Sequence, residues 1–303
     1  MASQQEDRQA QDARLKERMA GISHKLLVMS GKGGVGKTTV SVNIALTLAE
    51  KGYTVGLLDT DLHGPNVAKM LGADNAQLIS YDDGIEPFSV LKNLKVVSLS
   101  MAGHGPDTPV IWRGPLKIGV IKQFLADVNW GELDYLVVDT PPGTGDEPLA
   151  ACQLIDRPDG GIIVTTPQEL AAADVRKSVQ FCRRLNLPIL GILENMSGFI
   201  CPACGEQFPM FGKDGGRRTA EKYNEAFLGS IPIDPAIGIC SDAGTNFLEQ
   251  HTDSPAAQAF EKAVGQIDEA LKLLPPKDPS TCDNTCNGCP SSGSCSSAKP
   301  DEN

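Results

Sequence analysis

A run of nine residues near the amino terminus has the residue types and the spacing of a loop that binds phosphate groups. Residues 31–39 read GKGGVGKTT and fit the pattern GxxxxGK[ST]. Glycines let backbone N–H groups approach phosphate oxygens, Lys37 is placed to reach the terminal phosphates, and the Thr38 hydroxyl is placed to ligate Mg²⁺. The run therefore predicts a Mg-ATP site, and its expected residues are Gly31, Lys32, Gly33, Gly34, Val35, Gly36, Lys37, Thr38 and Thr39.

Two acidic segments follow apolar runs that are typical of buried strands. Asp61 lies in the sequence DTDLHGP after residues 54–58, and Asp139 lies in DTPPGTGD after residues 135–138. Asp139, which ends an apolar strand, suits a ligand that holds Mg²⁺ through its water shell, and the glycines after it suit a loop that senses the γ-phosphate. The alternative for Asp61 is a helix cap before Pro65.

Among nine cysteines, Cys201 and Cys204 form a CxxC pair on a turn that contains glycine. Two thiolates at this spacing can hold one metal centre together. A zinc ribbon would need a second CxxC about 15 to 20 residues later, and none is present. A two-fold dimer would supply four thiolates, enough for a 4Fe-4S cluster or a tetrahedral zinc, and a thiol-disulfide redox pair is the third alternative.

A second group of cysteines lies in the carboxyl-terminal tail, where residues 275–280 read as a stiff linker rich in proline. Its four thiols, spaced CxxxCxxCxxxxxC, are enough to enclose a 4Fe-4S cluster or a zinc, and a disordered tail rich in thiols is the remaining alternative. These residues are Cys282, Cys286, Cys289 and Cys295. The other three cysteines stand among apolar neighbours, and we expect Cys152, Cys182 and Cys240 to be small buried residues.

Strand and helix patterns alternate from residue 25 to residue 274, which indicates a single α/β domain with a mostly parallel sheet. We expect parallel strands at residues 25–30, 54–58, 95–100, 135–138, 162–165, 189–193 and 226–231. The expected organisation is a polar arm over residues 1–22, an ATPase domain over 23–274 and a linker with a cysteine-rich tail over 275–303. The arm is either a charged helix with Leu15 and Met19 on one side or a mobile segment.

The chain of 303 residues carries a formal net charge of −11, which argues against binding to nucleic acid or to an anionic membrane. No apolar run is long enough to span a bilayer, and the polar first 22 residues do not resemble a signal peptide. The sequence therefore predicts a cytoplasmic protein with no nucleic-acid partner and no membrane partner.

The string GKGGVGKTT resembles the deviant Walker A P-loop ATPases, the MinD-like group of P-loop NTPases. That resemblance implies helices on both faces of the sheet and a homodimer that sandwiches two nucleotides. It also implies that Lys32 reaches the nucleotide of the partner subunit and that Asp61 orients the attacking water. Lys32, Lys37 and Asp61 are accordingly the expected catalytic residues.

A narrower resemblance covers residues 22–274 and rests on five segments, GKGGVGKTT, DTDLHGPN, DTPPGTGDE, ENMSGFICPACG and FGKDGG. Together they are similar to the Mrp (ApbC-type) iron-sulfur cluster carrier ATPases. The resemblance implies that Cys201 and Cys204 hold a labile cluster between two subunits. It further implies slow ATP hydrolysis, an assembly scaffold as cluster donor and apo iron-sulfur proteins as recipients. Asn195, Pro232 and Asp234 match positions that contact adenine in related ATPases.

The tail resembles the CxGCP motif and final cysteine of the eukaryotic cytosolic scaffold ATPases, which implies a second cluster. In those proteins the motif lies at the amino terminus and its first cysteine is farther away, so the ligand role of Cys282 has the least support.

Two other functions compete with cluster transfer. The first is electron transfer, as in the nitrogenase-reductase-like ATPases, but those proteins bind their cluster with widely separated single cysteines and not with a CxxC. Spatial organisation, as in division-site or partition ATPases, predicts a basic or amphipathic membrane-binding end, and the tail supplies neither.

Overall fold

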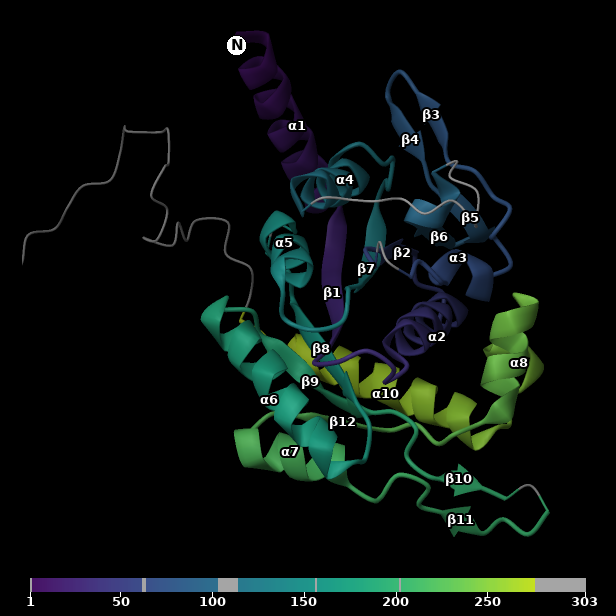
Figure 1. Cartoon of the computed structure of the whole chain (residues 1–303). Helices are drawn as coiled ribbons and strands as arrows, with labels where there is room; N and C mark the ends of the chain where they lie inside the picture. Colours follow the sequence, from purple (N-terminus) through teal and green to yellow (C-terminus); the bar gives the residue numbers. More distant parts are fainter. Residues whose placement is uncertain (1, 62–63, 103–113, 156, 202, 276–303) are drawn as a thin grey trace, which may run out of the picture.

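The computed structural model describes residues 2–61, 64–102, 114–155, 157–201 and 203–275. Within these ranges eight strands form one sheet (Figure 1), and β5 is antiparallel to its neighbour while the other strands are parallel. In spatial order the strands are β12 (Phe227–Ser230), β9 (Ile189–Glu194), β8 (Gly160–Thr165), β1 (Ile22–Ser30), β7 (Leu133–Asp139), β2 (Val55–Asp59), β6 (Leu94–Val97) and β5 (Phe88–Leu91).

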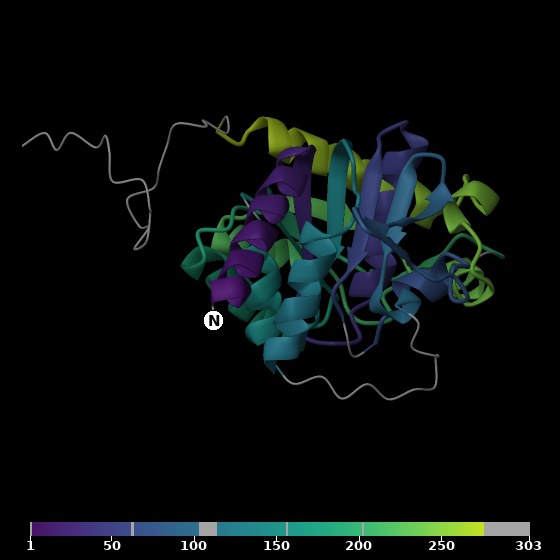
Figure 2. The ribbon, with the colours of Figure 1, turned by 90° about the horizontal axis from the view of Figure 1, so that it is seen from above.

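Helices cover both faces of the sheet, as expected. Alternate residues of β1 belong to different cores, because Leu26 and Val28 face one layer of helices while Leu27 and Met29 face the other. The first layer contains α2 (Lys37–Glu50), α3 (Val67–Met70), α8 (Pro235–Ala243), α9 (Phe247–Gln250) and α10 (Pro255–Lys272). The second contains α1 (Ala2–Ala20), α4 (Gly114–Ala126), α5 (Asp146–Leu154), α6 (Glu169–Arg184) and α7 (Gly215–Tyr223). Figure 2 shows α10 on one side of the strands and α1 and α4 on the other.

The seven expected parallel strands are all present, but the last three positions of the third one are wrong. The strand expected over 95–100 ends at Val97, and the chain continues as a 3₁₀ turn over Leu99–Met101. The turn follows Ser98, whose hydroxyl donates a hydrogen bond to Asp59 at 3.0 Å. The sequence patterns also missed the edge strand β5 and two short hairpins, which are β3 (Ile79–Tyr81) with β4 (Gly84–Glu86) and β10 (Phe199–Ile200) with β11 (Gln207–Phe208).

The amino-terminal segment is a helix, so the structure favours the first of the two alternatives for it. Leu15 and Met19 are buried, and α1 lies beside α4. Arg14 pairs with Asp127 at 3.0 Å across this contact. Throughout the described ranges, no helix combines the length and the apolar character needed to cross a bilayer.

Candidate functional site

The phosphate loop joins the carboxyl end of β1 to the start of α2, and its backbone conformation depends on glycine. Gly34 and Gly36 have φ angles of 79° and 78°, which side chains rarely adopt. A Cβ at Gly31 would lie 2.3 Å from the Asp174 carbonyl oxygen. The loop lines a cavity of about 260 Å³ together with Asp61 and other residues of the next loops.

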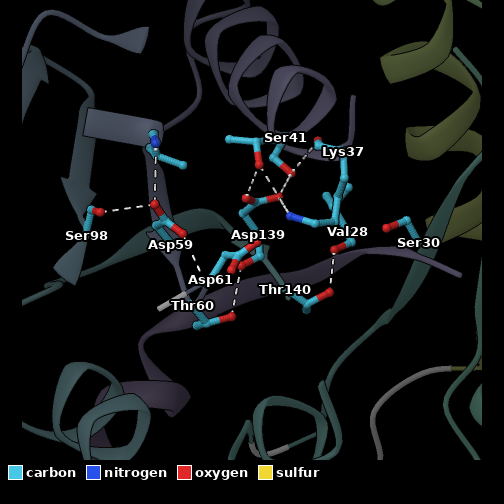
Figure 3. A network of polar contacts seen from close by, with 12 residues as sticks. Val28, Ser30, Lys37, Ser41, Asp59, Thr60, Asp61, Ser98, Asp139 and Thr140 are labelled. Atoms are coloured by element: carbon cyan, nitrogen blue, oxygen red, sulfur yellow. Dashed lines mark hydrogen bonds and ion pairs between the residues drawn. The ribbon is translucent and has the colours of Figure 1, made fainter. Parts of the chain in front are cut away.

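Asp139 is the centre of a buried polar network beside this loop (Figure 3). Its carboxylate accepts hydrogen bonds from Lys37 Nζ at 2.6 Å, Thr38 Oγ1 at 2.7 Å and Ser41 Oγ at 2.6 Å. The parallel register pairs Val28 with Asp139, so the end of β7 meets the start of the phosphate loop. A hydroxyl and a carboxylate that lie together form the all-oxygen donor set that Mg²⁺ prefers, and these residues therefore fit the ion.

Asp59 is a buried carboxylate of the same network that the sequence patterns did not single out. It lies opposite Asp139 in the register of β2 and β7 and accepts hydrogen bonds from the Asp61 backbone N–H at 3.0 Å and from Ser98 Oγ. Burial, and then the nearby negative charge of Asp139, raise the pKa of Asp59 to about 8. A usable signal existed, because β2 and β7 both end in an aspartate that is followed by a threonine.

The structure brings the three expected catalytic residues to one place. Lys32 and Asp61 line the same cavity as Lys37, and all three lie at the carboxyl edge of the parallel strands. The backbone carbonyl of Lys32 accepts a hydrogen bond from Ser30 Oγ at 2.9 Å, which holds the turn that presents this lysine. One chain thus supplies the phosphate loop and a second lysine that lines the same cavity.

The three residues expected near adenine lie on adjacent segments, because the Ser197 backbone N–H donates to the Ile231 carbonyl oxygen at 2.8 Å, but they make different contacts. Asn195, which directly follows β9, donates from Nδ2 to the Val35 carbonyl oxygen at 2.9 Å, and a Cβ at Gly36 would lie 2.2 Å from that nitrogen. Pro232 and Asp234 instead line a cavity of about 370 Å³ beside Cys201. Asp234 caps α8 by accepting from the Ala236 backbone N–H at 2.9 Å.

The CxxC pair lies on the hairpin formed by β10 and β11, which projects from the sheet (Figure 1). The Cys201 backbone N–H donates to the Glu206 carbonyl at 2.9 Å, and the Cys201 backbone carbonyl accepts from the Gly205 N–H at 2.8 Å. Cys204 is exposed and Cys201 is half-buried. Hydrogen bonds from the Ala203 backbone, the Cys204 backbone and the Cys204 side chain lower the pKa of Cys201. This favours the thiolate, which is the form that binds metal.

The pair offers two thiols and no more. Within the described part of the chain, no group of three or more His, Cys, Asp or Glu side chains is placed to hold a metal ion. Cys152, Cys182 and Cys240 are buried, as expected, and burial raises the pKa of both Cys152 and Cys182 to about 12. The four tail cysteines, Cys282, Cys286, Cys289 and Cys295, lie outside the described residues.

A mostly parallel sheet with a phosphate loop after β1, and with aspartates at the ends of β2 and β7, defines a P-loop NTPase. The additional lysine of the loop, Lys32, is typical of the deviant Walker A class. Residues 21–268 match the ParA family model for the NUBPL iron-transfer P-loop NTPases, and the chain belongs to this family.

Individual proteins agree with this assignment. An iron-sulfur cluster carrier protein of Methanococcus maripaludis is 47% identical over 262 residues, which cover 86% of this chain and 90% of the relative. The solved structure of a nucleotide-binding protein of Archaeoglobus fulgidus in complex with ADP is 40% identical, with a TM-score of 0.71, and the match covers 82% of this chain and 95% of that one. The cell division ATPase MinD of Pyrococcus furiosus shares the fold, with a TM-score of 0.61 at 24% identity over 82% of this chain and 99% of its own.

Proposed function

We propose that this protein is an ATP-dependent iron-sulfur cluster carrier that holds a labile 4Fe-4S cluster between the CxxC pairs of two subunits. The observation that carries the proposal is the thiol pair on a projecting hairpin, with Cys204 exposed and Cys201 half-buried, in a chain that also carries a phosphate loop. Two chains supply the four thiolates that one cluster requires. The family and the carrier name of its relatives agree with this function.

Each residue of the nucleotide site has a proposed role. Lys37 binds the terminal phosphates, while Thr38 and Asp139 hold Mg²⁺, the ion that neutralises phosphate charge during hydrolysis. Asp61 orients the attacking water, and Lys32 reaches the nucleotide bound by the partner subunit. Asp139 already accepts from both Lys37 and Thr38, so the groups that would bind the nucleotide are held in place by one carboxylate.

The nucleotide and the cluster are proposed to be coupled through the segment between the two sites. Asn195 contacts the phosphate loop, and Cys201 follows it closely along the chain. A nucleotide that changes the position of this segment would change the affinity of the cysteines for the cluster. A coupling free energy of about 1 to 3 kcal/mol corresponds to about 5- to 150-fold in affinity, which is enough to separate loading from release.

The proposed setting follows from these roles. The protein acts as a homodimer in the cytoplasm, receives clusters from an assembly scaffold and delivers them to apo iron-sulfur proteins, without nucleic-acid or membrane partners. Thiolates persist there because the cytosol is reducing. Pro232 and Asp234, together with Asn195, are proposed to contact adenine. The tail cysteines Cys282, Cys286, Cys289 and Cys295 are proposed to hold a second, more tightly bound cluster.

The test is anaerobic reconstitution with iron and sulfide quantification, Mössbauer spectroscopy and transfer to an apo-enzyme with and without ATP. We expect the double variant C201S/C204S to lose the labile cluster and its transfer and to keep nucleotide binding. The matched control is C240S, which removes a buried thiol away from the hairpin and is expected to transfer normally. Retained transfer by C201S/C204S would refute the carrier function, and redox cycling without any transfer would favour electron transfer.

Truncation after Leu274 tests the tail separately. We expect it to remove the tightly bound iron and to leave the labile cluster at Cys201 and Cys204. Unchanged iron per chain after truncation would show that the tail is not a cluster site.

A further inference from the structure

Both ends of the cysteine hairpin are tied to one buried carboxylate. Glu194, the last residue of β9, is fully buried. Its Oε1 accepts from Ser197 Oγ at 2.6 Å, and its Oε2 accepts from the Gly216 backbone N–H at 2.6 Å. Ser197 stands just before the hairpin and Gly216 stands after it, so a single side chain joins the segment that enters the hairpin to the segment that leaves it.

The second of these ends is built around Glu194. A Cβ at Gly216 would lie 2.9 Å from Glu194 Cβ, so only glycine lets the backbone approach this closely. Gly216 lies in the first turn of α7, and Asp214 at the N-cap of that helix makes no side-chain capping bond. The Glu194 carboxylate therefore accepts a hydrogen bond from an N–H in the first turn of α7, where the N-cap residue makes no side-chain capping bond.

The hairpin has few other contacts that hold it. Each of its strands has two residues, and Phe208, Met210 and Phe211 are exposed. Besides the Glu194 bonds, two backbone hydrogen bonds attach its base: the Ser197 N–H donates to the Ile231 carbonyl at 2.8 Å, and the Ile233 N–H donates to the Gly198 carbonyl at 2.7 Å. Such short, exposed pairing is marginal in water, so the position of the thiols depends on the base.

We propose that Glu194 is a positioning residue of the cysteine site, which sets where Cys201 and Cys204 are presented by holding Ser197 and Gly216 together. This inference rests on the proposed function in one respect, namely that these cysteines hold the cluster. Glu194 precedes Asn195, the residue that contacts the phosphate loop, so adjacent side chains of one strand end serve the two sites.

Four variants of the full-length chain separate this role from general stability. E194A removes both acceptors, and S197A removes the bond at the entering end only. E194Q can restore both bonds, because its amide oxygen accepts from Gly216 and its NH₂ group donates to Ser197 Oγ. S230A is the matched control, since Ser230 Oγ also donates to Glu194 Oε1, at 3.4 Å, but lies at the end of β12 and outside the hairpin.

The first measurement is amide hydrogen exchange of residues 199–214 in the nucleotide-free protein without a cluster. A hydrogen bond to a charged group contributes enough that its loss should accelerate hairpin exchange by about tenfold or more in E194A and S197A. We expect E194Q and S230A to exchange like the wild type. The second measurement is the rate at which a chelator extracts the iron that depends on Cys201 and Cys204, and it should rise in the same two variants.

Wild-type exchange in S197A and E194A would overturn the inference, and so would equal acceleration in S197A and S230A. If E194A does not fold, S197A and its control decide the question. A wild-type protein that holds no cysteine-dependent iron would refute the proposed function, whereas the exchange experiment would still test Glu194.

Discussion

The nucleotide site and the cysteine hairpin are built in opposite ways. Asp139 is completely buried and receives three side-chain hydrogen bonds, whereas Cys204 is exposed on a hairpin whose strands have two residues each. The phosphate loop and the carboxylates beside it come from one chain, whereas the thiol pair is, in the proposed function, half of a four-ligand site. Under the proposed function, folding of one chain positions the groups of the nucleotide site, whereas the cysteine site depends on the association of two chains.

The burial of the Asp139 network and the accessibility of the cysteines each have a physical reason. A buried carboxylate is tolerated only when paired and hydrogen-bonded, so Asp139 forces Lys37, Thr38 and Ser41 into position before any nucleotide arrives. Thiolates that must accept and release a cluster need access from outside. Their exposure leaves the hairpin with little packing, and the few hydrogen bonds at its base gain importance.

The largest expected difference between the two regions is in folding stability. Replacing Lys37 by alanine leaves the buried Asp139 without its cation and should lower the free energy of unfolding by about 3 to 5 kcal/mol. Replacing the exposed Cys204 by serine should change it by less than about 0.5 kcal/mol. Urea denaturation of the nucleotide-free protein measures both. Similar losses in the two variants would contradict the contrast between the regions.

A pH dependence should appear in the nucleotide site. The pKa of Asp59 is raised from 3.8 to about 8 in the folded protein, so the folded state holds a proton that the unfolded state releases between these values. Stability from this residue is therefore present below pH 3.8 and lost as the pH rises through about 8. The unfolding free energy of the wild type, relative to D59N, should fall by up to about 1.4 kcal/mol per pH unit within this window. If the unfolding free energies of the wild type and D59N change in parallel with pH, the raised pKa of Asp59 is refuted.

Lys32 should matter for turnover and much less for nucleotide binding, because its proposed partner belongs to the other subunit. Cations supplied across an interface to a transferred phosphoryl group accelerate hydrolysis by about 10³- to 10⁵-fold, so K32A should lose at least about a hundredfold in kcat. Its affinity for ATP should stay close to that of the wild type. K51A removes an exposed lysine outside the cavity and is the control. Full turnover in K32A would contradict the nucleotide sandwich.

The smallest effect is expected within the hairpin. Gly198 and Gly205 both have positive φ angles, of 80° and 73°, so alanine at either position costs about 1 kcal/mol in backbone strain. A Cβ at Gly198 would also lie 3.1 Å from the Phe208 carbonyl oxygen, whereas nothing lies within 4 Å at Gly205. Amide exchange of the hairpin should therefore accelerate more in G198A than in G205A. The reverse order would show that crowding at the base does not limit the hairpin.

The parallel sheet and its phosphate loop could be predicted because their signals are continuous in sequence. Apolar strands, the GKGGVGKTT loop and the helix after it follow one another, and the glycines needed for positive φ stand inside the motif. Strands β10 and β11 could not be predicted in this way, since two residues are too few to show a period of two. The antiparallel edge strand β5 and the 3₁₀ turn after β6 likewise depend on tertiary neighbours.

The sequence by itself determined the chemistry that this protein can perform, because the lysines, the strand-end aspartates and the paired cysteines can be recognised by type and spacing. Only the tertiary structure decided which buried groups meet. The register of β2 and β7 places Asp59 beside Asp139, and the return of the chain after β11 brings Gly216 to Glu194. Buried polar groups must find partners wherever the fold brings them, and those partners lie far away along the chain.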